Sequence, residues 1–241
     1  MMELRPFESL GAANHGWLDA RHHFSFASYH DPSRVHWGNL RVWNDDTIAA
    51  GTGFPTHPHS DMEIITYVRK GAITHRDSMG NEGRTEAGDV QVMSAGNGVQ
   101  HSEYNLEDED TTLFQIWIIP DERGGEPSWG ARKFPKNDRA GTFVPLASGA
   151  ANNDDAQSGA LPIRTNARVL GATVTAGESV TYSPADASRH LYLVPATGQI
   201  RIEGGGEQLS AKARDGVAIT QLDSVTITAL EDSELVLVDA A

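Results

Sequence analysis

The apolar residues of this chain come in short runs, and within many of these runs they alternate with polar residues. Examples are GNLRVWND (38–45), MEIITYVRKG (62–71), GDVQVMSAG (88–96) and LFQIWIIP (113–120). Valine, isoleucine, threonine, tryptophan and tyrosine dominate the runs, and polar segments that contain glycine, such as MGNEGR (79–84), separate them. Such alternation favours strands, and such segments favour turns. The first half of the chain is therefore predicted to be a series of β-strands.

The texture changes at IIPDERGGEPSWG (118–130), where glycine and proline are frequent and apolar residues are few. The segment ASGAANNDDAQSGALP (147–162) has few core-forming residues and is predicted to be an exposed loop. The strand rhythm returns at RVLGATVTAGESVTYS (168–183) and continues to the C-terminus. We therefore expect an all-β protein with two domains, at residues 1–133 and 134–241. Many short strands at regular spacing are typical of a sandwich or barrel.

Composition narrows the classes of function. Hydrophobic residues make up 39% of the 241 residues and charged residues 22%, as in ordinary globular proteins. No apolar run is long enough to span a bilayer, and the segment MMELRPFESL lacks the pattern of a secretory signal, so we expect a cytoplasmic protein. Cysteine is absent, which excludes disulfides, thiol nucleophiles and cysteine metal sites. The formal net charge of −14 disfavours direct binding of nucleic acids.

Two pairs of polar residues have the spacing of metal ligands. His57 and His59 open the segment HPHSDMEIITYV, and His101 and Glu103 flank Ser102. In a strand, residues i and i+2 project from the same face, so the members of each pair point together. If the two segments are neighbouring strands of one barrel, three imidazoles and one carboxylate converge on its interior. This donor set suits a divalent transition metal such as Fe(II), Mn, Co, Ni, Cu or Zn, and it leaves open positions for catalysis.

The segment around His57 and His59 resembles the first sequence motif of cupins, in which glycine, five residues, HxH and a later glutamate follow one another. Residues 88–105 resemble the second motif, with glycine before the strand and then Gly98-Val99-Gln100-His101. More narrowly, the chain resembles the pirin family, and within it the bacterial pirin-like quercetin 2,3-dioxygenases. The stretches that carry this resemblance are NHGWLDARHHFSFASYHDP (14–32), LRVWNDD (40–46), GFPTHPHSDMEIITYV (53–68), HRDSMGN (75–81), MSAGNGVQHSEYN (93–105) and LFQIWIIP (113–120).

The resemblance implies a bicupin fold, in which two β-barrels of the jelly-roll type lie side by side and the N-terminal one holds the metal. It implies His57, His59, His101 and Glu103 as the ligands and iron(II) as the metal. It also implies a dioxygenase that cleaves the ring of a flavonol such as quercetin with O2 and releases carbon monoxide. The predicted partners are therefore a small aromatic substrate and O2, and Glu103 is a candidate catalytic base because a carboxylate within hydrogen-bond reach can accept a proton.

Several residues have a second interpretation. Glu63 is the glutamate of the first cupin motif, but four residues of straight strand separate it from His59, so we choose Glu103 as the ligand. Glu63 is then either an acid near the site or a surface residue at a strand end. His75 is expected at an exposed strand end, and His190, the only histidine after residue 101, is expected to bind no metal, which makes the second barrel metal-free.

Aromatic and loop residues near the motifs are also candidates. We expect the N-terminal aromatic residues of segment 14–26 to pack on a core, and Phe54, Met62, Met93 and Trp117 are candidate pocket walls. Two other classes of function stay open. One is a metal-binding regulatory protein of the pirin type, which acts on a protein partner without turnover. The other is a cupin enzyme with different chemistry, since one fold hosts many reactions.

Overall fold

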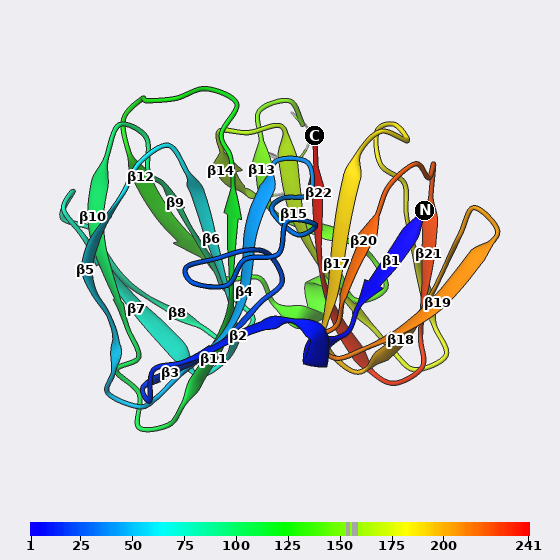
Figure 1. Ribbon diagram of the computed structural model, residues 1–241, viewed down its shortest axis with the longest axis horizontal. Helices are drawn as coiled ribbons and strands as arrows, with labels where there is room; N and C mark the ends of the chain where they lie inside the picture. Colours follow the sequence, from blue (N-terminus) through cyan, green and yellow to red (C-terminus); the bar gives the residue numbers. More distant parts are fainter. Residues whose placement is uncertain (153–154, 156–158) are drawn as a thin grey trace.

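The computed structural model describes residues 1–152, 155 and 159–241, and they form two β-barrels side by side (Figure 1). Each barrel consists of one seven-stranded and one four-stranded sheet. The described helices are two short 3-10 turns, η1 (Phe7–Ser9) and η2 (Lys136–Arg139), and neither is long and apolar enough to cross a membrane. The prediction of an all-β bicupin is thus confirmed.

In the first barrel the seven-stranded sheet has the order β12-β9-β6-β11-β4-β3-β2 and the four-stranded sheet the order β5-β10-β7-β8. The strands are β2 (Gly11–Asn14), β3 (Leu18–His22), β4 (Leu40–Ile48), β5 (Gly53–His59), β6 (Glu63–Lys70), β7 (Ala72–Asp77), β8 (Glu82–Glu86), β9 (Val90–Ser94), β10 (Val99–Tyr104), β11 (Thr111–Ile118) and β12 (Ser128–Arg132).

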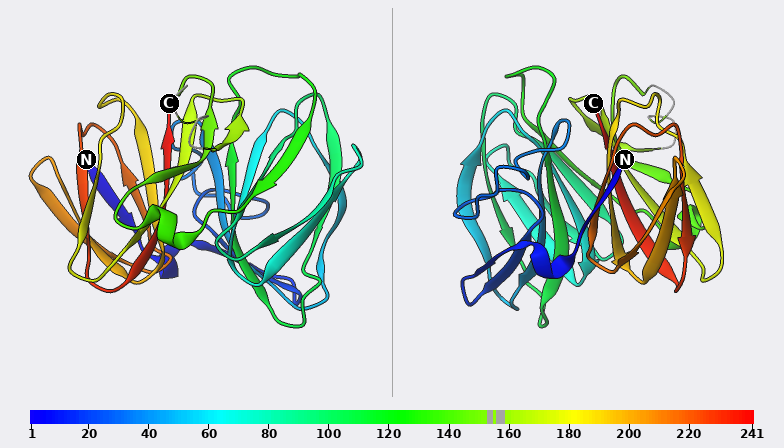
Figure 2. Two further views of the ribbon diagram at one scale, coloured as in Figure 1. Left: turned by 180° about the vertical axis from the view of Figure 1, so that it is seen from behind. Right: turned by 45° about the vertical axis from the view of Figure 1, so that its right-hand side comes forward.

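The second barrel repeats this plan with the orders β1-β20-β17-β22-β15-β13-β14 and β16-β21-β18-β19. Its strands are β1 (Met2–Arg5), β13 (Val144–Gly149), β14 (Leu161–Ile163), β15 (Ala167–Val174), β16 (Ser179–Tyr182), β17 (His190–Thr197), β18 (Gln199–Gly204), β19 (Glu207–Lys212), β20 (Gly216–Ile219), β21 (Val225–Ala229) and β22 (Ser233–Ala240). Strand β1, drawn in blue beside the red and orange strands in Figure 2, pairs with β20 although it starts the chain. The division at residue 133 stays a prediction.

The expected loop over residues 147–162 is wrong at both ends, because β13 and β14 occupy them and Ala147 and Ser148 are buried. Small residues are needed in this strand because another segment passes close by: a Cβ on Gly149 would lie 1.8 Å from the carbonyl oxygen of Thr165. Small residues therefore belong here to a packed strand and not to a loop. Residues 153–154 and 156–158 of the expected loop lie outside the described residues.

The two large sheets pack face to face, and alternation along one strand explains how. On β11, the side chains of Phe114 and Ile116 belong to the core between the barrels, together with Tyr192 and Val236 from the second barrel. The intervening residues of β11 face the interior of the first barrel. Burial of both faces explains why this strand reads as a nearly continuous apolar run.

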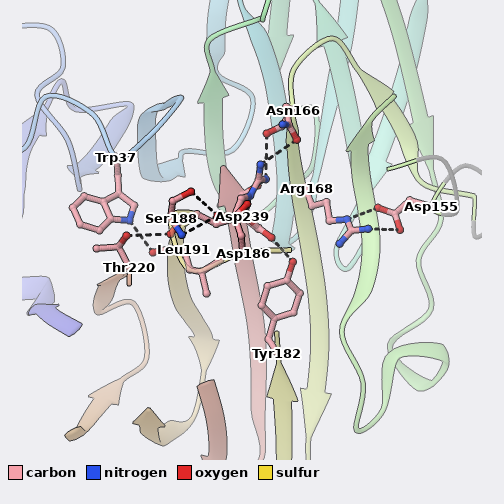
Figure 3. A network of polar contacts seen from close by, with 11 residues as sticks. Trp37, Asp155, Asn166, Arg168, Tyr182, Asp186, Ser188, Leu191, Thr220 and Asp239 are labelled. Carbon is pink, nitrogen blue, oxygen red and sulfur yellow. Dashed lines mark hydrogen bonds and ion pairs between the residues drawn. The ribbon is translucent and has the colours of Figure 1, made fainter. Parts of the chain in front are cut away.

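One cluster of buried polar groups in the second barrel, around Asp239, is satisfied by its own hydrogen bonds. Asp239 on β22 accepts hydrogen bonds from the Nε atom of Arg189 at 2.6 Å and from the hydroxyl group of Tyr182 at 2.5 Å (Figure 3). Arg189 also donates to the side chain of Asn166 at 3.0 Å. Because each of these groups has a partner, the cluster is a structural one, and the cost of burying the charges is offset locally.

Candidate metal centre

Three histidines meet on the paired strands β5 and β10. His101 lies opposite His57 in the antiparallel register, and their Nε2 atoms are 3.1 Å apart. The ring of His59 lies 4.8 Å from that of His57 and 5.0 Å from that of His101. One ring nitrogen from each of the three lies within 4.8 Å of the others. The i, i+2 spacing thus brings His57, His59 and His101 together as the sequence analysis expected.

The local sequence of β5 suits an edge position, and it fixes the tautomer of one candidate ligand, His57. Proline at 55 and 58 removes two backbone donors, which is tolerated because β5 ends its four-stranded sheet. The Nδ1 atom of His57 lies 2.7 Å from the carbonyl oxygen of Pro55. Nδ1 must therefore carry the proton and donate it to that oxygen, which leaves the lone pair of Nε2 facing His101.

The three rings fit a divalent transition metal. Two imidazole nitrogens bound at right angles to an ion at about 2.1 Å stand roughly 3 Å apart, close to the spacing of the two Nε2 atoms. Burial, together with the neighbouring rings of His57 and His59, lowers the pKa of His101 to about 2. Burial also lowers the pKa of His59 to about 4. These imidazoles are neutral at neutral pH, which is the form that binds metals.

Glu103 lies deeper in the barrel than the histidine cluster. Its Oε1 atom accepts a hydrogen bond from Gln91 at 2.7 Å, and its Oε2 atom accepts one from Gln115 at 2.9 Å. Burial raises the pKa of Glu103 to about 7, although these hydrogen bonds act in the opposite direction. A carboxylate oxygen of Glu103 lies within 4.8 Å of ring nitrogens of His75 and His101, and these three residues form a second candidate metal-binding group. This group does not contain His57 or His59. The role of Glu103 as the fourth ligand stays a prediction.

A bulge explains why Glu103 departs from simple i, i+2 geometry. His101 pairs with His57, but Glu103 pairs with Phe54, so β5 contributes one extra residue between the two pairs. Bulges bend a strand and redirect side chains, and they are frequent beside active sites. The sequence alone did not reveal this bulge, because parity along β10 is kept and the extra residue lies on the partner strand.

Of the two roles expected of Glu63, one is wrong and the other, an acid near the site, stays a prediction. Glu63 is buried at the start of β6, so the expectation of a surface residue is wrong. Its Oε2 atom accepts hydrogen bonds from the Ser94 hydroxyl group at 2.6 Å and from the backbone N–H of Arg164 at 3.1 Å. This carboxylate therefore ties the first barrel to a segment of the second, and neither candidate metal-binding group includes it.

His75 was expected at an exposed strand end, and this expectation is wrong. It is fully buried on β7, where its ring stacks on that of Trp129 with centroids 4.8 Å apart and planes 7° apart. One ring nitrogen lies 2.9 Å from a carboxylate oxygen of Asp77, and the other lies 3.3 Å from Nδ1 of His101. A signal was present in the sequence, since His75 and Asp77 share the same i, i+2 spacing as His57 and His59.

A largely apolar cavity of about 530 Å³ lies beside the histidine cluster. The aromatic side chains of Trp17, Phe26 and Phe54 line it, which agrees with the expected packing of the N-terminal aromatics and with Phe54 as a pocket wall. Phe54 lies 6.2 Å from the ring of His57, and Gln115 lines the cavity while donating to Glu103. The cavity therefore lies next to the cluster through Phe54, although none of the three clustered histidines lines it.

The other expected pocket walls lie elsewhere. Met62 and Met93 pack in a small apolar cluster of the first barrel, so they do not line this cavity. Trp117 packs edge-on between two rings, with centroids 5.0 Å from His59 and 5.4 Å from Phe26. Trp117 thus separates the histidine cluster from the aromatic lining of the cavity.

One carboxyl group faces the cavity without a protein partner. Asp46 on β4 is buried and lines the cavity, and its Oδ1 atom has no hydrogen-bond partner among the described residues. Burial, with the nearby carboxylates of Asp45 and Glu103, raises the pKa of Asp46 well above its ordinary value. A raised pKa favours the neutral acid, which can both donate and accept a hydrogen bond.

In the second barrel, strands β16 and β21 occupy the places of β5 and β10. Their inward residues, among them Val180, Val225 and Ile227, belong to one continuous apolar core. His190 packs edge-on against Trp37 with ring centroids 5.1 Å apart. Within the described part of the chain, both candidate metal-binding groups lie in the first barrel.

Comparisons with known proteins agree with this architecture. The sequence model of the pirin family matches residues 3–118, and that of the quercetinase C-terminal cupin domain matches residues 148–240. A pirin-like protein of Caulobacter vibrioides is 62% identical over 241 residues, which span 100% of both chains. A protein of Escherichia coli named quercetin 2,3-dioxygenase is 41% identical over 240 residues, which span 99% of this chain and 98% of that one.

Solved structures give the same result. The crystal structure of YhhW from Escherichia coli has a TM-score of 0.91 at 40% identity and spans 100% of this chain and 98% of its own. The structure of this bacterial pirin in complex with nickel(II) has a TM-score of 0.90 at 39% identity, with 100% and 99% of the two chains covered. Two barrels with the expected motifs, and relatives that match over the whole length, confirm the predicted membership: this chain belongs to the pirin family.

Proposed function

We propose that this protein is a metal-dependent dioxygenase that cleaves the central ring of a flavonol. In this reaction one O2 is consumed, both of its oxygen atoms enter the products, and one ring carbon leaves as carbon monoxide. The observation that carries the proposal is the proximity of three clustered imidazoles to an aromatic cavity of about 530 Å³, whose lining residue Phe54 lies next to His57. This volume falls within the range of small-molecule sites, and the name of the Escherichia coli relative supports the same chemistry.

His57, His59 and His101 would hold the metal, with Glu103 as the fourth ligand. Imidazoles with a carboxylate suit several first-row ions, and we propose iron(II), which this donor set holds in many oxygenases. The nickel(II) complex of YhhW supports the binding of a divalent ion by this protein. When bound, such an ion supplies a Lewis acid that favours the ionised form of a substrate hydroxyl group.

The cavity provides recognition of a flat, hydroxylated aromatic molecule. Trp17, Phe26 and Phe54 offer ring faces and edges to such a substrate, and they keep water away from it. The carboxyl group of Asp46 can pair with one substrate hydroxyl group, because no described protein group occupies its Oδ1 atom. A substrate without hydroxyl groups would leave Asp46 buried and unpaired, which disfavours its binding.

Glu103 is placed to hold the proton that the substrate releases. A pKa of about 7 lets its carboxyl group exist in both protonation states near neutral pH. The amide groups of Gln91 and Gln115 fix its orientation. In the variant Glu103→Gln, which cannot accept a proton, we expect turnover to fall about 100-fold or more. Full turnover with normal metal content in this variant would rule out the role as a base.

The test is oxygen uptake with quercetin by protein purified without oxygen and loaded with iron(II), manganese(II) or nickel(II). We expect metal content near one ion per chain and uptake of O2 in the wild type. His59→Ala should lose both, since one ring of the cluster is gone, whereas His190→Ala, the control in the second barrel, should keep both. Bound metal without uptake from any hydroxylated aromatic would overturn the dioxygenase proposal in favour of a regulatory protein. A folded protein that binds no metal would overturn the metal site itself.

A further inference from the structure

His75 and Asp77 form a buried chain of hydrogen bonds that ends on His101. The ring nitrogen Nε2 of His75 lies 2.9 Å from a carboxylate oxygen of Asp77, and its Nδ1 atom lies 3.3 Å from Nδ1 of His101. His75 and Asp77 lie on β7, which pairs with the strand of His101 along one edge while the strand of His57 pairs along the other. The motif HRDSMGN thus brings a third strand to the candidate metal centre.

The donors and acceptors of this chain can be assigned in one direction. A carboxylate only accepts hydrogen bonds, so Nε2 of His75 must carry a proton and donate it to Asp77. In a neutral ring, Nδ1 of His75 is then an acceptor, and it requires a donor from Nδ1 of His101. A neutral His101 with its proton on Nδ1 has its lone pair on Nε2, the atom that faces His57 at 3.1 Å.

The carboxylate of Asp77 is itself held firmly. Its Oδ1 atom accepts the backbone N–H groups of Met79 and Asn81 at 2.9 and 3.0 Å, and its Oδ2 atom accepts the Asn81 side chain at 2.9 Å. The Ser78 backbone N–H, in the same turn, donates to the carbonyl oxygen of Gln100 at 2.8 Å. The turn is therefore fastened to β10 one residue before His101.

The ring of His75 is fixed from a second side by Trp129 on β12. The two rings are stacked, and Gly83 leaves room for the indole, because a Cβ at that position would lie 2.2 Å from it. The orientation of His75 thus depends on packing as well as on hydrogen bonds. Such supporting groups behind a ligand commonly fix its tautomer and ring position.

We propose that His75 and Asp77 are positioning residues that hold His101 as the tautomer protonated on Nδ1, with Nε2 free for the metal. The proposal rests on the proposed function in assigning His101 as a ligand. His57 reaches the same tautomer by a different route, through the carbonyl oxygen of Pro55. Two ligands are therefore preset before any ion arrives, one by the backbone of its own strand and one by a neighbouring strand.

The variant Asp77→Asn tests the direction of the chain. The asparagine oxygen can still accept the backbone N–H groups of the turn, but its NH2 group then faces His75 and donates to it. His75 must turn into a donor at Nδ1, and His101 must then carry its proton on Nε2. In 15N NMR spectra of the metal-free protein, we expect the Nδ1–H form of His101 in the wild type and the Nε2–H form in the variant.

Metal affinity is the second measurement. Titration with nickel(II) should show affinity about 10- to 100-fold lower in Asp77→Asn than in the wild type, the usual range when such a supporting group is lost. His75→Phe keeps a ring on Trp129 without its nitrogens and should weaken binding to a similar degree. Glu82→Gln, which removes a surface ion pair with Arg76 from the same hairpin, should bind nickel(II) like the wild type.

The outcomes separate this inference from the proposed function. An unchanged His101 tautomer in folded Asp77→Asn, with affinity within about twofold of the wild type, would overturn the inference. If the wild type binds no metal but the tautomer still inverts in the variant, the hydrogen-bond chain stands and the metal proposal fails. If His75→Phe does not fold, Asp77→Asn, which keeps the oxygen that accepts the backbone N–H groups of Met79 and Asn81, decides the matter alone.

Discussion

Strands β5 and β10 of the first barrel hold the same places in their sheet as β16 and β21 hold in the second. On the first pair the inward residues include His57, His101 and Glu103, whereas on the second they include Val180 and Ile227. The second barrel has one continuous apolar core, but the apolar residues inside the first are divided into two smaller clusters. The same strand order thus forms a barrel with polar ligand-type residues inside in one case and a barrel with an apolar core in the other.

The two barrels differ in whether their buried polar side chains already have partners within the protein, and this difference decides where a ligand can bind. In the second barrel Asp239 is paired on both oxygens by Arg189 and Tyr182, so this buried carboxylate is not free to bind a ligand. In the first barrel, the lone pairs on the Nε2 atoms of His57 and His101 face each other, and the Oδ1 atom of Asp46 has no partner among the described residues. Groups left in this state cost stability in the free protein, and the packed second barrel offsets that cost.

The largest effect on stability is expected at the joint between the barrels. Glu234 on β22 accepts hydrogen bonds from Tyr67, from Arg139 at 3.1 Å and from Lys136 at 2.6 Å. Glu234→Gln leaves the buried guanidinium of Arg139 without an opposite charge, and such a change costs about 3–5 kcal/mol. Urea unfolding should show this loss, while Glu231→Gln, an exposed residue nearby, should unfold like the wild type. A loss below about 1 kcal/mol would show that the pair does not join the barrels.

A comparable or smaller effect should separate the roles of the barrels. Ile227→Ala leaves a cavity in the second core and is expected to lower the free energy of unfolding by about 2–5 kcal/mol, with nickel(II) affinity almost unchanged. His101→Ala should do the reverse and abolish metal binding at a smaller cost in stability. The measurements are urea unfolding of metal-free protein and nickel(II) titration. Equal loss of nickel(II) affinity in both variants would contradict the view that the first barrel binds the metal while the second contributes only stability.

The smallest effect concerns Asp46 and depends on pH. Its pKa is raised by burial, so folding favours the protonated acid. This contribution is present below the unfolded pKa of about 3.9 and is lost as pH rises through the folded value. Asp46→Asn cannot ionise and should therefore become more stable than the wild type as pH rises from about 4, by roughly 1–3 kcal/mol at pH 8. Unfolding of chelator-treated protein across this range, with exposed Asp110→Asn as control, checks the slope, and a constant difference would contradict it.

Most of the strands and three histidines of the site followed from local patterns, because alternation and i, i+2 spacing are properties of a single strand. The position of His75 beside His101 could not be predicted, because it depends on the order of strands in the sheet, which no local pattern specifies. The burial of Asp46 could not be predicted either, because two adjacent acidic residues, Asp45 and Asp46, resemble a solvated surface pair in sequence. Its burial follows from the N-terminal segment that covers that face, which lies apart from it in the chain.

The crossing of β1 to the second barrel has a consequence during synthesis on the ribosome. Met2 pairs with Ile219, so β1 must wait until residues 216–219 have been translated before its partner exists. At about 5–20 residues per second, this delay is roughly 10–40 s. The first barrel can close within that time, whereas β1 stays unpaired until β20 has been made. A nascent chain stalled before residue 216 would therefore carry a closed first barrel beside an unfinished second barrel with β1 still unpaired.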